Sequence, residues 1–400
     1  FAIACLLLRD TGYLQLGGYD ADGNDTTNPV SFLTLEAISR LRLPSNAGVC
    51  VGRGISRELL RRSVEMQFQD KCGNPRFVGT DALVDGLQRN PGVTLEDARM
   101  RTNAGCHWLA IPGREYSIMD CVKINFAAVM EIALQEAVER LGEPDIEDIL
   151  AIYEKHMKLC VDTLAQGFTF NYENQIHNMP ELVISLMSYG TIEQGLDCSG
   201  GGVEKYLWCI DGSALAVVAD SLAAIEQRVL TEKRYTYAQL MQFLKSDWAG
   251  PDGERARQFM QSVDHYGKGG SRADLWAKRL SDIFTQAVTA ARTPKYGHAM
   301  VPGLFSWAST LDLGAQVGAT ANGRKAGRPV NHGANPNPGF RTDGAATAMS
   351  QAIASVQCGY GNTSPMQLEM EPSVTADEGG IEAVMALIED HFASGGTLIN

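Results

Sequence analysis

The sequence predicts an α/β protein, and two features of the chain carry this prediction. Short apolar segments of strand-like composition alternate with amphipathic, helix-like segments along nearly the whole length. The loops between them are longer and richer in Gly, Asn and Asp than a minimal doubly wound sheet requires. With 44% apolar and 20% charged residues among 400, the composition is that of a folded globular chain.

The first quarter of the chain sets the alternating pattern. Strands are predicted at 13–16 and 47–51, and helices at 30–42, 56–68, 80–88 and 94–101. Phe32, Leu35 and Ile38 recur at helical spacing in the first of these helices, and Pro44 ends it. The last helix begins with a capping box that runs from Thr94 to Asp97.

The rest of the chain continues the pattern with longer helices. Short apolar strands and Gly-rich loops separate them. Amphipathic periodicity predicts helices at 122–141, 146–166, 180–187, 213–229, 237–248, 271–291 and 381–393.

Charge and cysteine content exclude several classes of protein. The formal net charge of -13 argues against a nucleic-acid binder, because phosphate neutralisation needs a basic surface. The longest apolar stretch, 214–225, is too short to cross a bilayer and is interrupted by Asp220. The nine cysteines form no CxxC pair, so we expect reduced thiols, no bound metal and a cytoplasmic protein without membrane contact.

The two ends predict a fragment. The chain begins with Phe1 and stops at GGTLIN, within a predicted strand, where a natural domain rarely ends. No linker or repeat divides the remainder. We therefore expect residues 1–400 to form one domain that is cut at both ends.

The stretch TNAGCHWLAIPGREY, 102–116, holds the most informative cysteine. Cys106 follows Gly105, which permits a tight turn, and lies on a predicted loop between helices. Most free cysteines are buried and inert, and this is our interpretation of Cys121, Cys160 and Cys209.

Several segments, in one order along the chain, carry a resemblance to a known family. They are LGGYDADGNDTTNPVSFLTLEA (16–37), LEDARMRTNAGCHW (95–108), ADSLAAI (219–225), GATANGRKAGRPVNHGANPNPG (318–339) and HFASGGTLIN (391–400). Together they resemble the glycyl radical enzymes, the pyruvate formate-lyase-like family. The resemblance implies a ten-stranded α/β barrel with Cys106 on a central loop. The family's radical glycine lies C-terminal to GGTLIN, so we expect it, and its domain, to be absent from these 400 residues.

The resemblance also implies the chemistry and the partners. A radical S-adenosylmethionine iron–sulfur enzyme installs the glycyl radical, no cofactor stays bound, and the Cys106 thiyl radical takes hydrogen from a small organic substrate under anaerobic conditions. The cysteine reacts as a neutral thiol, so a depressed pKa is not required. We also expect a homodimer.

Two residues after Cys106 depart from the family pattern. Many family dehydratases read Gly-Cys-Val-Glu, with the Glu as general base, whereas here His107 and Trp108 follow. His107 either acts as the base or hydrogen-bonds the loop. Trp108 either walls an apolar substrate or packs the barrel. The pyruvate-cleaving members carry paired cysteines, and Cys106 has no cysteine neighbour.

Four further residues are predicted to bind substrate. Arg114 either clamps a carboxylate or is an ordinary surface arginine. Tyr206 and Trp208 lie in a segment that resembles one lining the family's cavity, and Trp307 is a further candidate wall residue. The triple glycine at 200–202 lacks the Walker pattern of a phosphate loop, and no HExxH motif indicates zinc.

We therefore expect a glycyl radical enzyme, and the missing Glu favours a C–C lyase or decarboxylase. A dehydratase of the glycerol or diol type that uses His107, and a fumarate-adding succinate synthase, are alternatives. A catalytically inactive paralogue with a binding role is the non-enzyme alternative. A hydrolase with a Cys106–His107 pair is disfavoured, because adjacent side chains seldom point at each other.

Overall fold

The computed structural model describes residues 13–42, 46–104, 108–118, 122–340 and 346–400. The helices are α2 (Pro29–Leu41), α3 (Arg57–Asp70), α4 (Thr80–Leu87), α5 (Leu95–Met100), α6 (Phe126–Leu141), α7 (Ile146–Asn178), α8 (Leu182–Leu186), α9 (Thr191–Gln194), α10 (Leu215–Ala224), α11 (Tyr237–Lys245), α12 (Gly250–Gln261), α13 (Arg272–Ala290), α14 (Thr310–Ala315), α15 (Ala346–Ser355) and α16 (Glu378–Ala393), with shorter turns η1 (Cys198–Gly200), η2 (Ile225–Thr231), η3 (Trp307–Ser309) and η4 (Pro372–Thr375). The strands are β1 (Tyr13–Leu16), β2 (Asn46–Val51), β3 (Arg76–Gly79), β4 (Thr102–Ala104), β5 (Trp108–Ala110), β6 (Glu115–Ile118), β7 (Lys123–Asn125), β8 (Lys205–Ser213), β9 (Met300–Gly303), β10 (Pro365–Met366) and β11 (Leu398–Ile399).

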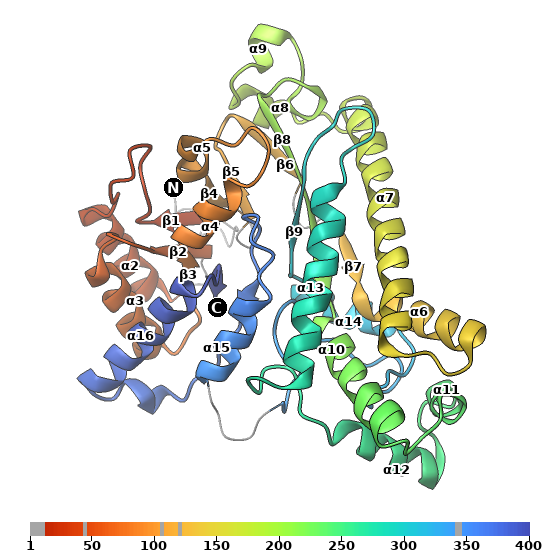
Figure 1. Ribbon diagram of the computed structural model, residues 1–400. Coiled ribbons are helices and arrows are strands. Elements are labelled where there is room, and N and C mark those ends of the chain that lie inside the picture. The colour runs from red at the N-terminus through yellow and green to blue at the C-terminus, as the bar shows by residue number, and fades with distance from the viewer. Residues whose placement is uncertain (1–12, 43–45, 105–107, 119–121, 341–345) are drawn as a thin grey trace.

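The described strands form a five-stranded sheet, a four-stranded sheet and a two-stranded one (Figure 1). The first sheet has the order β1-β2-β3-β11-β10, so the N-terminal strands pair with the last strand of the chain. β1, β2 and β3 are parallel, β11 runs antiparallel to β3, and β10 is parallel to β11. The second sheet is parallel throughout and centres on β8, which pairs with β6, β7 and β9.

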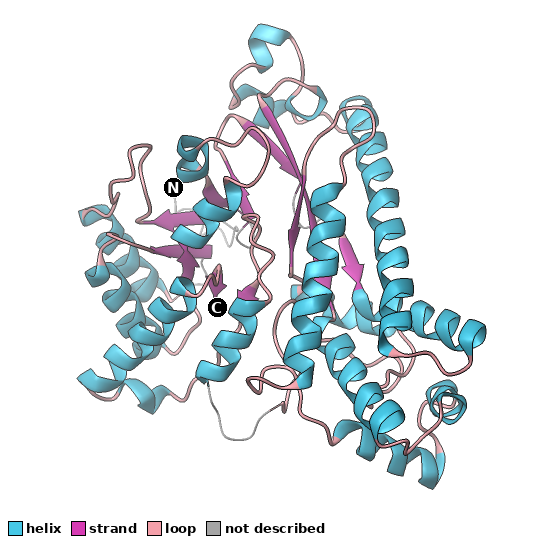
Figure 2. Ribbon diagram, in the orientation of Figure 1, coloured by secondary structure: helices cyan, strands magenta, loops and turns pink. Residues whose placement is uncertain are grey.

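A two-stranded hairpin bridges the two sheets. β4 and β5 pair antiparallel, with Thr102 opposite Ala110 and Ala104 opposite Trp108. β4 lies beside β1 of the first sheet and β5 beside β6 of the second. The hairpin therefore joins the β1 edge of the first sheet to the β6 edge of the second. Figure 2 shows the strands of the molecule with helices around them.

Helices cover the outer faces of both sheets (Figure 1). α10 and α13 pack on each other, and α13 packs on β9, while α7 packs on α6 and α13. On the other sheet α16 packs on α3 and α4, and α2 packs on α3. One hydrophobic core joins these layers and includes the fully buried side chains of Phe126, Tyr153 and Phe284.

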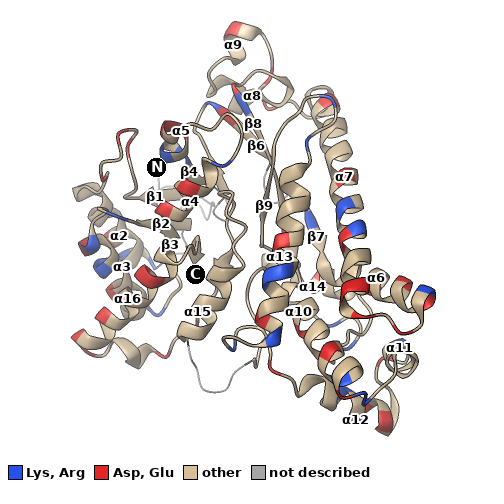
Figure 3. Ribbon diagram, viewed as in Figure 1, with Lys and Arg blue, Asp and Glu red and all other residues tan. Residues whose placement is uncertain are grey.

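Charged residues of both signs are interspersed on the outer helices (Figure 3). The α3–α16 contact is the densest example: Arg57 bonds Glu382 and Glu389, while Arg61 bonds Glu378 and Glu382. Such exposed pairs contribute little to stability individually. In the described part of the chain, no helix has the length and apolar character needed to cross a membrane.

The predicted α/β class is confirmed, and several elements differ from their predicted bounds. The helix predicted at 122–141 begins later, at Phe126, because residues 123–125 pair with β8 as β7. α7 continues twelve residues past the predicted end, Gln166, because packing sustains the helix through Gly167. The helix predicted at 213–229 is divided, since Ser213 ends β8 and residues 225–231 form a π-helical turn.

Candidate functional site

The two predicted catalytic residues fall between β4 and β5 in the sequence. Cys106 and His107 belong to the connection between β4 and β5, residues 105–107, which lies outside the described residues. The sequence analysis expected Cys106 directly after a helix, whereas β4 separates helix α5 from this connection. Ala104 and Trp108, the last described residues on either side of it, are opposite each other in the ladder.

Trp108 fixes where this end of the hairpin lies. Its side chain is 6% exposed, and its ring meets the ring of Phe305 edge-on at 5.2 Å. Phe305 follows the carboxyl end of β9. Trp108 is therefore next to the carboxyl end of the parallel strand β9. Active sites of α/β proteins concentrate at the carboxyl ends of parallel strands.

Four aromatic rings form a cluster at this position: Trp108, Phe305, Trp307 and His332. Phe305 stacks parallel to Trp307 at 6.1 Å, and the His332 ring stands edge-on to both. Trp307 is 41% exposed and has a left-handed backbone, with φ of 41°. Trp307 therefore lies at the solvent end of the cluster, and Trp108 lies at its buried end.

His332 is held as a neutral imidazole with one defined tautomer. Burial lowers the pKa of His332 to about 4. Its Nδ1 accepts the backbone N–H of Trp307 at 2.8 Å, so the proton of the neutral ring belongs on Nε2. Nε2 is buried and has no partner among the described residues. His332 is thus suited to donate a hydrogen bond, and unsuited to act as a base near neutral pH.

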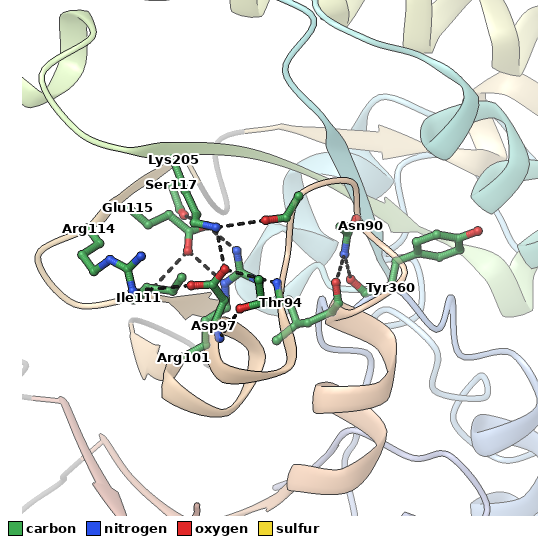
Figure 4. A network of polar contacts seen from close by, with 12 residues as sticks. Asn90, Thr94, Asp97, Arg101, Ile111, Arg114, Glu115, Ser117, Lys205 and Tyr360 are labelled. Atoms are coloured by element: carbon green, nitrogen blue, oxygen red, sulfur yellow. Dashed lines mark hydrogen bonds and ion pairs between the residues drawn. The ribbon is translucent and has the colours of Figure 1, made fainter. Parts of the chain in front are cut away.

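A polar network holds the other end of the hairpin, and Figure 4 shows its members. Arg101 directly precedes β4, and Glu115 begins β6. The guanidinium of Arg101 makes a two-point contact with the Glu115 carboxylate, Nε to Oε2 at 2.9 Å and Nη2 to Oε1 at 3.2 Å. Both side chains are almost completely buried.

Asp97 organises a second, outer layer of this network (Figure 4). Its carboxylate accepts from Lys205 Nζ at 2.6 Å and closes the predicted capping box with Thr94. Burial acts to raise the pKa of Asp97, but the hydrogen bonds from Lys205 and Thr94 outweigh it and hold this pKa at about 2. Helix α5, which leads into the hairpin, is thereby fixed to the amino end of β8.

Arg114, predicted to clamp a substrate carboxylate, is bonded to protein carboxylates. Its guanidinium contacts Glu204 at 2.8 Å and Asp97 at 3.5 Å. The hydrogen bond to Glu204 raises the pKa of Arg114. The structure places Arg114 at the stem of the hairpin and away from the aromatic cluster.

Tyr206 and Trp208 lie together, on the face of β8 that packs against α7. Trp208 is 1% exposed, packs on Phe168 of α7 at 4.7 Å and donates its Nε1–H to His298 Nδ1. The Tyr206 hydroxyl donates to the carbonyl of Cys198 and accepts the N–H of Gly201, each at 2.7 Å. The structure brings neither residue into the aromatic cluster, whereas Trp108 and Trp307 both belong to it.

The opposite face of β8 carries a polar contact that the sequence did not single out. Asp211 Oδ1 accepts from Asn362 Nδ2 at 3.0 Å, and Gly303 of β9 is paired beside Asp211. A Cβ on Gly303 would collide with the Asn362 amide. Asp211 and Asn362 are 151 positions apart in the chain, so no local motif marks this contact.

Two cavities lie near the hairpin, one beside the aromatic cluster and one at the hairpin stem. A groove of about 980 Å³ is lined by Trp307, His332, Asn335, Gln367 and Met370. A polar pocket of about 630 Å³ lies at the hairpin stem and is lined by Arg101, Arg114, Glu115 and Lys205, among others. Within the described ranges, His, Cys, Asp and Glu side chains nowhere gather in the threes or more that would hold a metal ion.

Comparison with known proteins identifies the family and the fold. Residues 11–314 match the family described as Pyruvate formate lyase-like, and the chain belongs to this family. The (2S)-3-sulfopropanediol dehydratase of Klebsiella oxytoca is 27% identical over 95% of this chain and 48% of its own length.

Solved structures show the same fold. A structure from work on 1,2-propanediol dehydration in Roseburia inulinivorans has a TM-score of 0.90 at 25% identity, covering 97% of this chain and 50% of that one. A glycyl radical enzyme from Archaeoglobus fulgidus has a TM-score of 0.88 at 25% identity, covering 98% of this chain and 51% of that one. The chain thus spans about half the length of the relatives it matches.

Proposed function

We propose that this chain is the barrel portion of a glycyl radical enzyme, in which Cys106 carries the thiyl radical. The observation that supports the proposal is the burial of the hairpin: β4 lies beside β1, β5 lies beside β6, and the side chains of Trp108 and Leu109 are 6% and 5% exposed. A buried position suits a radical, because excluded water and oxygen cannot quench it. The glycyl radical would take the hydrogen atom from the Cys106 thiol, and its glycine is not among the described residues.

The residues of this chain then have defined roles. The Cys106 sulfur takes one hydrogen atom from a substrate carbon and returns one to the product radical, so the cysteine is regenerated. The aromatic cluster of Trp108, Phe305, Trp307 and His332 would form an apolar wall, in which the Nε2–H of His332 is a polar donor. A radical S-adenosylmethionine activating enzyme and a homodimer remain the proposed partners.

The proposed reaction is the elimination of water from a small substrate with adjacent hydroxyl groups. The relatives support it, because one is a sulfopropanediol dehydratase and another structure concerns 1,2-propanediol dehydration. This reverses the sequence-based preference for C–C cleavage, which we retain as the second candidate because Trp108 cannot accept a proton and packs on Phe305. Dehydration then needs another base, for which His107 is the proposed residue.

Activity of the anaerobically activated, full-length protein tests the proposal. The substrates are (2S)-3-sulfopropanediol, 1,2-propanediol and glycerol, with indoleacetate as a decarboxylation substrate. We expect the wild type to convert a diol to an aldehyde, and Cys106→Ser to convert none. Carbon dioxide release from the acid alone would favour the second candidate, and equal activity in Cys106→Ser would exclude the thiyl mechanism.

A further inference from the structure

The buried Glu115 carboxylate connects both strands of the hairpin, at its stem, to the second sheet. Glu115 Oε2 accepts from Arg101 Nε at 2.9 Å, and also from the backbone N–H of Ile111 at 3.1 Å. Oε1 accepts from Arg101 Nη2 at 3.2 Å and from the hydroxyl of Ser117 at 2.8 Å. Arg101 is the residue before β4, and Ile111 is the residue after β5, so the chain is tied where it enters and where it leaves the hairpin (Figure 4).

The pair is buried more deeply than its energetics alone would favour. The side chains of Arg101 and Glu115 are 2% and 0% exposed. Desolvating two charges costs free energy that their attraction only partly restores, so a well-packed apolar pair is often as stable. A two-point Arg–carboxylate contact does, however, fix relative position and orientation, which an apolar pair does not.

We propose that Arg101 and Glu115 form a latch that sets the position of the β4–β5 hairpin along the barrel. This inference rests on the proposed function, because it makes Arg101 and Glu115 positioning residues for the Cys106 thiol. Arg101 lies within the 95–108 segment that indicated the family, whereas Glu115 lies outside all five of those segments. Neither residue belongs to the aromatic cluster at the other end of the hairpin.

The geometry of the hairpin makes the latch effective. Only three residue pairs, from Thr102–Ala110 to Ala104–Trp108, separate the latch from the connection that holds Cys106. A slip of one residue along a strand moves the hairpin by roughly 3.3 Å. Displacement of a reacting atom by about 1 Å can reduce a rate on the order of 100-fold.

Three variants of the activated, full-length protein separate positioning from stability. Glu115→Gln leaves the Arg101 guanidinium buried without its counter-charge, so we expect a lower melting temperature and a kcat reduced by on the order of 100-fold, with KM near the wild-type value. The double variant Arg101→Met, Glu115→Leu removes both charges, so the melting temperature should recover while kcat stays low. Arg101→Lys keeps the charge without the planar two-point contact, and an intermediate kcat is expected.

Glu232→Gln is the matched control. Arg228 of η2 donates from one nitrogen, Nη1, to both carboxylate oxygens of Glu232, at 2.6 and 2.7 Å, and this pair is remote from the hairpin in sequence. This variant should lower the melting temperature and leave kcat unchanged. If kcat in the double variant recovers together with the melting temperature, the pair is structural only and the latch is refuted.

A second readout keeps the latch testable apart from the activity. Amide hydrogen exchange in unactivated protein should be faster at 102–104 and 108–110 in Glu115→Gln and in the double variant, and unchanged there in Glu232→Gln. Wild-type exchange in the double variant would overturn the latch. Absence of turnover in the wild type on every substrate, with faster exchange in the variants, would instead refute the proposed function and leave the latch standing.

Discussion

At the scale of single residues, Tyr206 separates a structural role from a substrate-binding one. Its hydroxyl joins the Cys198 carbonyl and the Gly201 N–H, and burial raises its pKa. Tyr206→Phe removes the hydroxyl and leaves both backbone groups without this partner, so the free energy of unfolding should fall by about 1–3 kcal/mol. Chemical denaturation measures this fall, and an unchanged KM would accompany it. A raised KM at unchanged stability would instead show that Tyr206 binds substrate, as the sequence analysis expected.

Candidate residues could be identified from the sequence, but the face of the strand on which they lie and the residues that they contact could not. The capping box from Thr94 to Asp97 was predictable, because its donors and acceptors are three residues apart. The orientation of Tyr206 and Trp208 was not, because β8 is buried on both faces and shows no polar alternation. The partner of Arg114 was not predictable either, because Glu204 lies ninety residues further along the chain.

At the scale of elements, the contact between β8, β9 and the segment before β10 depends on a glycine. A Cβ on Gly303 would displace the Asn362 amide from Asp211. Gly303→Ala should therefore lower the free energy of unfolding by about 1–3 kcal/mol through overpacking and a strained hydrogen bond. Gly73→Ala is the control, because its Cβ would meet no atom within 4 Å. Equal stability of the two variants would show that the contact yields without cost.

Long periodic elements were predictable from the sequence, and short ones were not. The helices that became α3, α13 and α16 were predicted within three residues at each end. β4, β5 and β7 have three residues each and exist through pairing with other strands. α12 was missed because its segment begins Gly-Pro and is polar over most of its length.

At the scale of the whole molecule, buried histidines make stability depend on pH. Burial lowers the pKa of both His332 and His391 from 6.5 to about 4. His391 is completely buried beside Ser350, and Asp390 is the nearby charged group that raises its pKa slightly. Since the unfolded chain binds more protons below pH 6.5, stability should be full above pH 6.5 and fall between pH 6.5 and 4, by about 2 kcal/mol per histidine at pH 5.

Denaturation at pH 7 and pH 5 checks this prediction. His391→Gln removes one titrating group, so its stability should differ less between the two pH values than that of the wild type. The same pH difference in both proteins would show that His391 is already protonated in the folded state.

The family and the barrel fold emerged from motifs spread over nearly the whole chain, and the family match and the structural neighbours confirm both. The reaction did not emerge as clearly, because it depends on residues around Cys106 that differ from the family pattern. The residues of the aromatic cluster come from segments far apart in sequence, such as those of Trp108 and His332, and only the fold brings them together.

Electron paramagnetic resonance of the activated, full-length protein, read together with turnover, tests the central claim most directly. We predict a doublet radical signal in both wild type and Cys106→Ser, which disappears on exposure to air, and substrate consumption by the wild type alone. Absence of the signal after activation in both proteins, or equal substrate consumption by Cys106→Ser, would contradict the account.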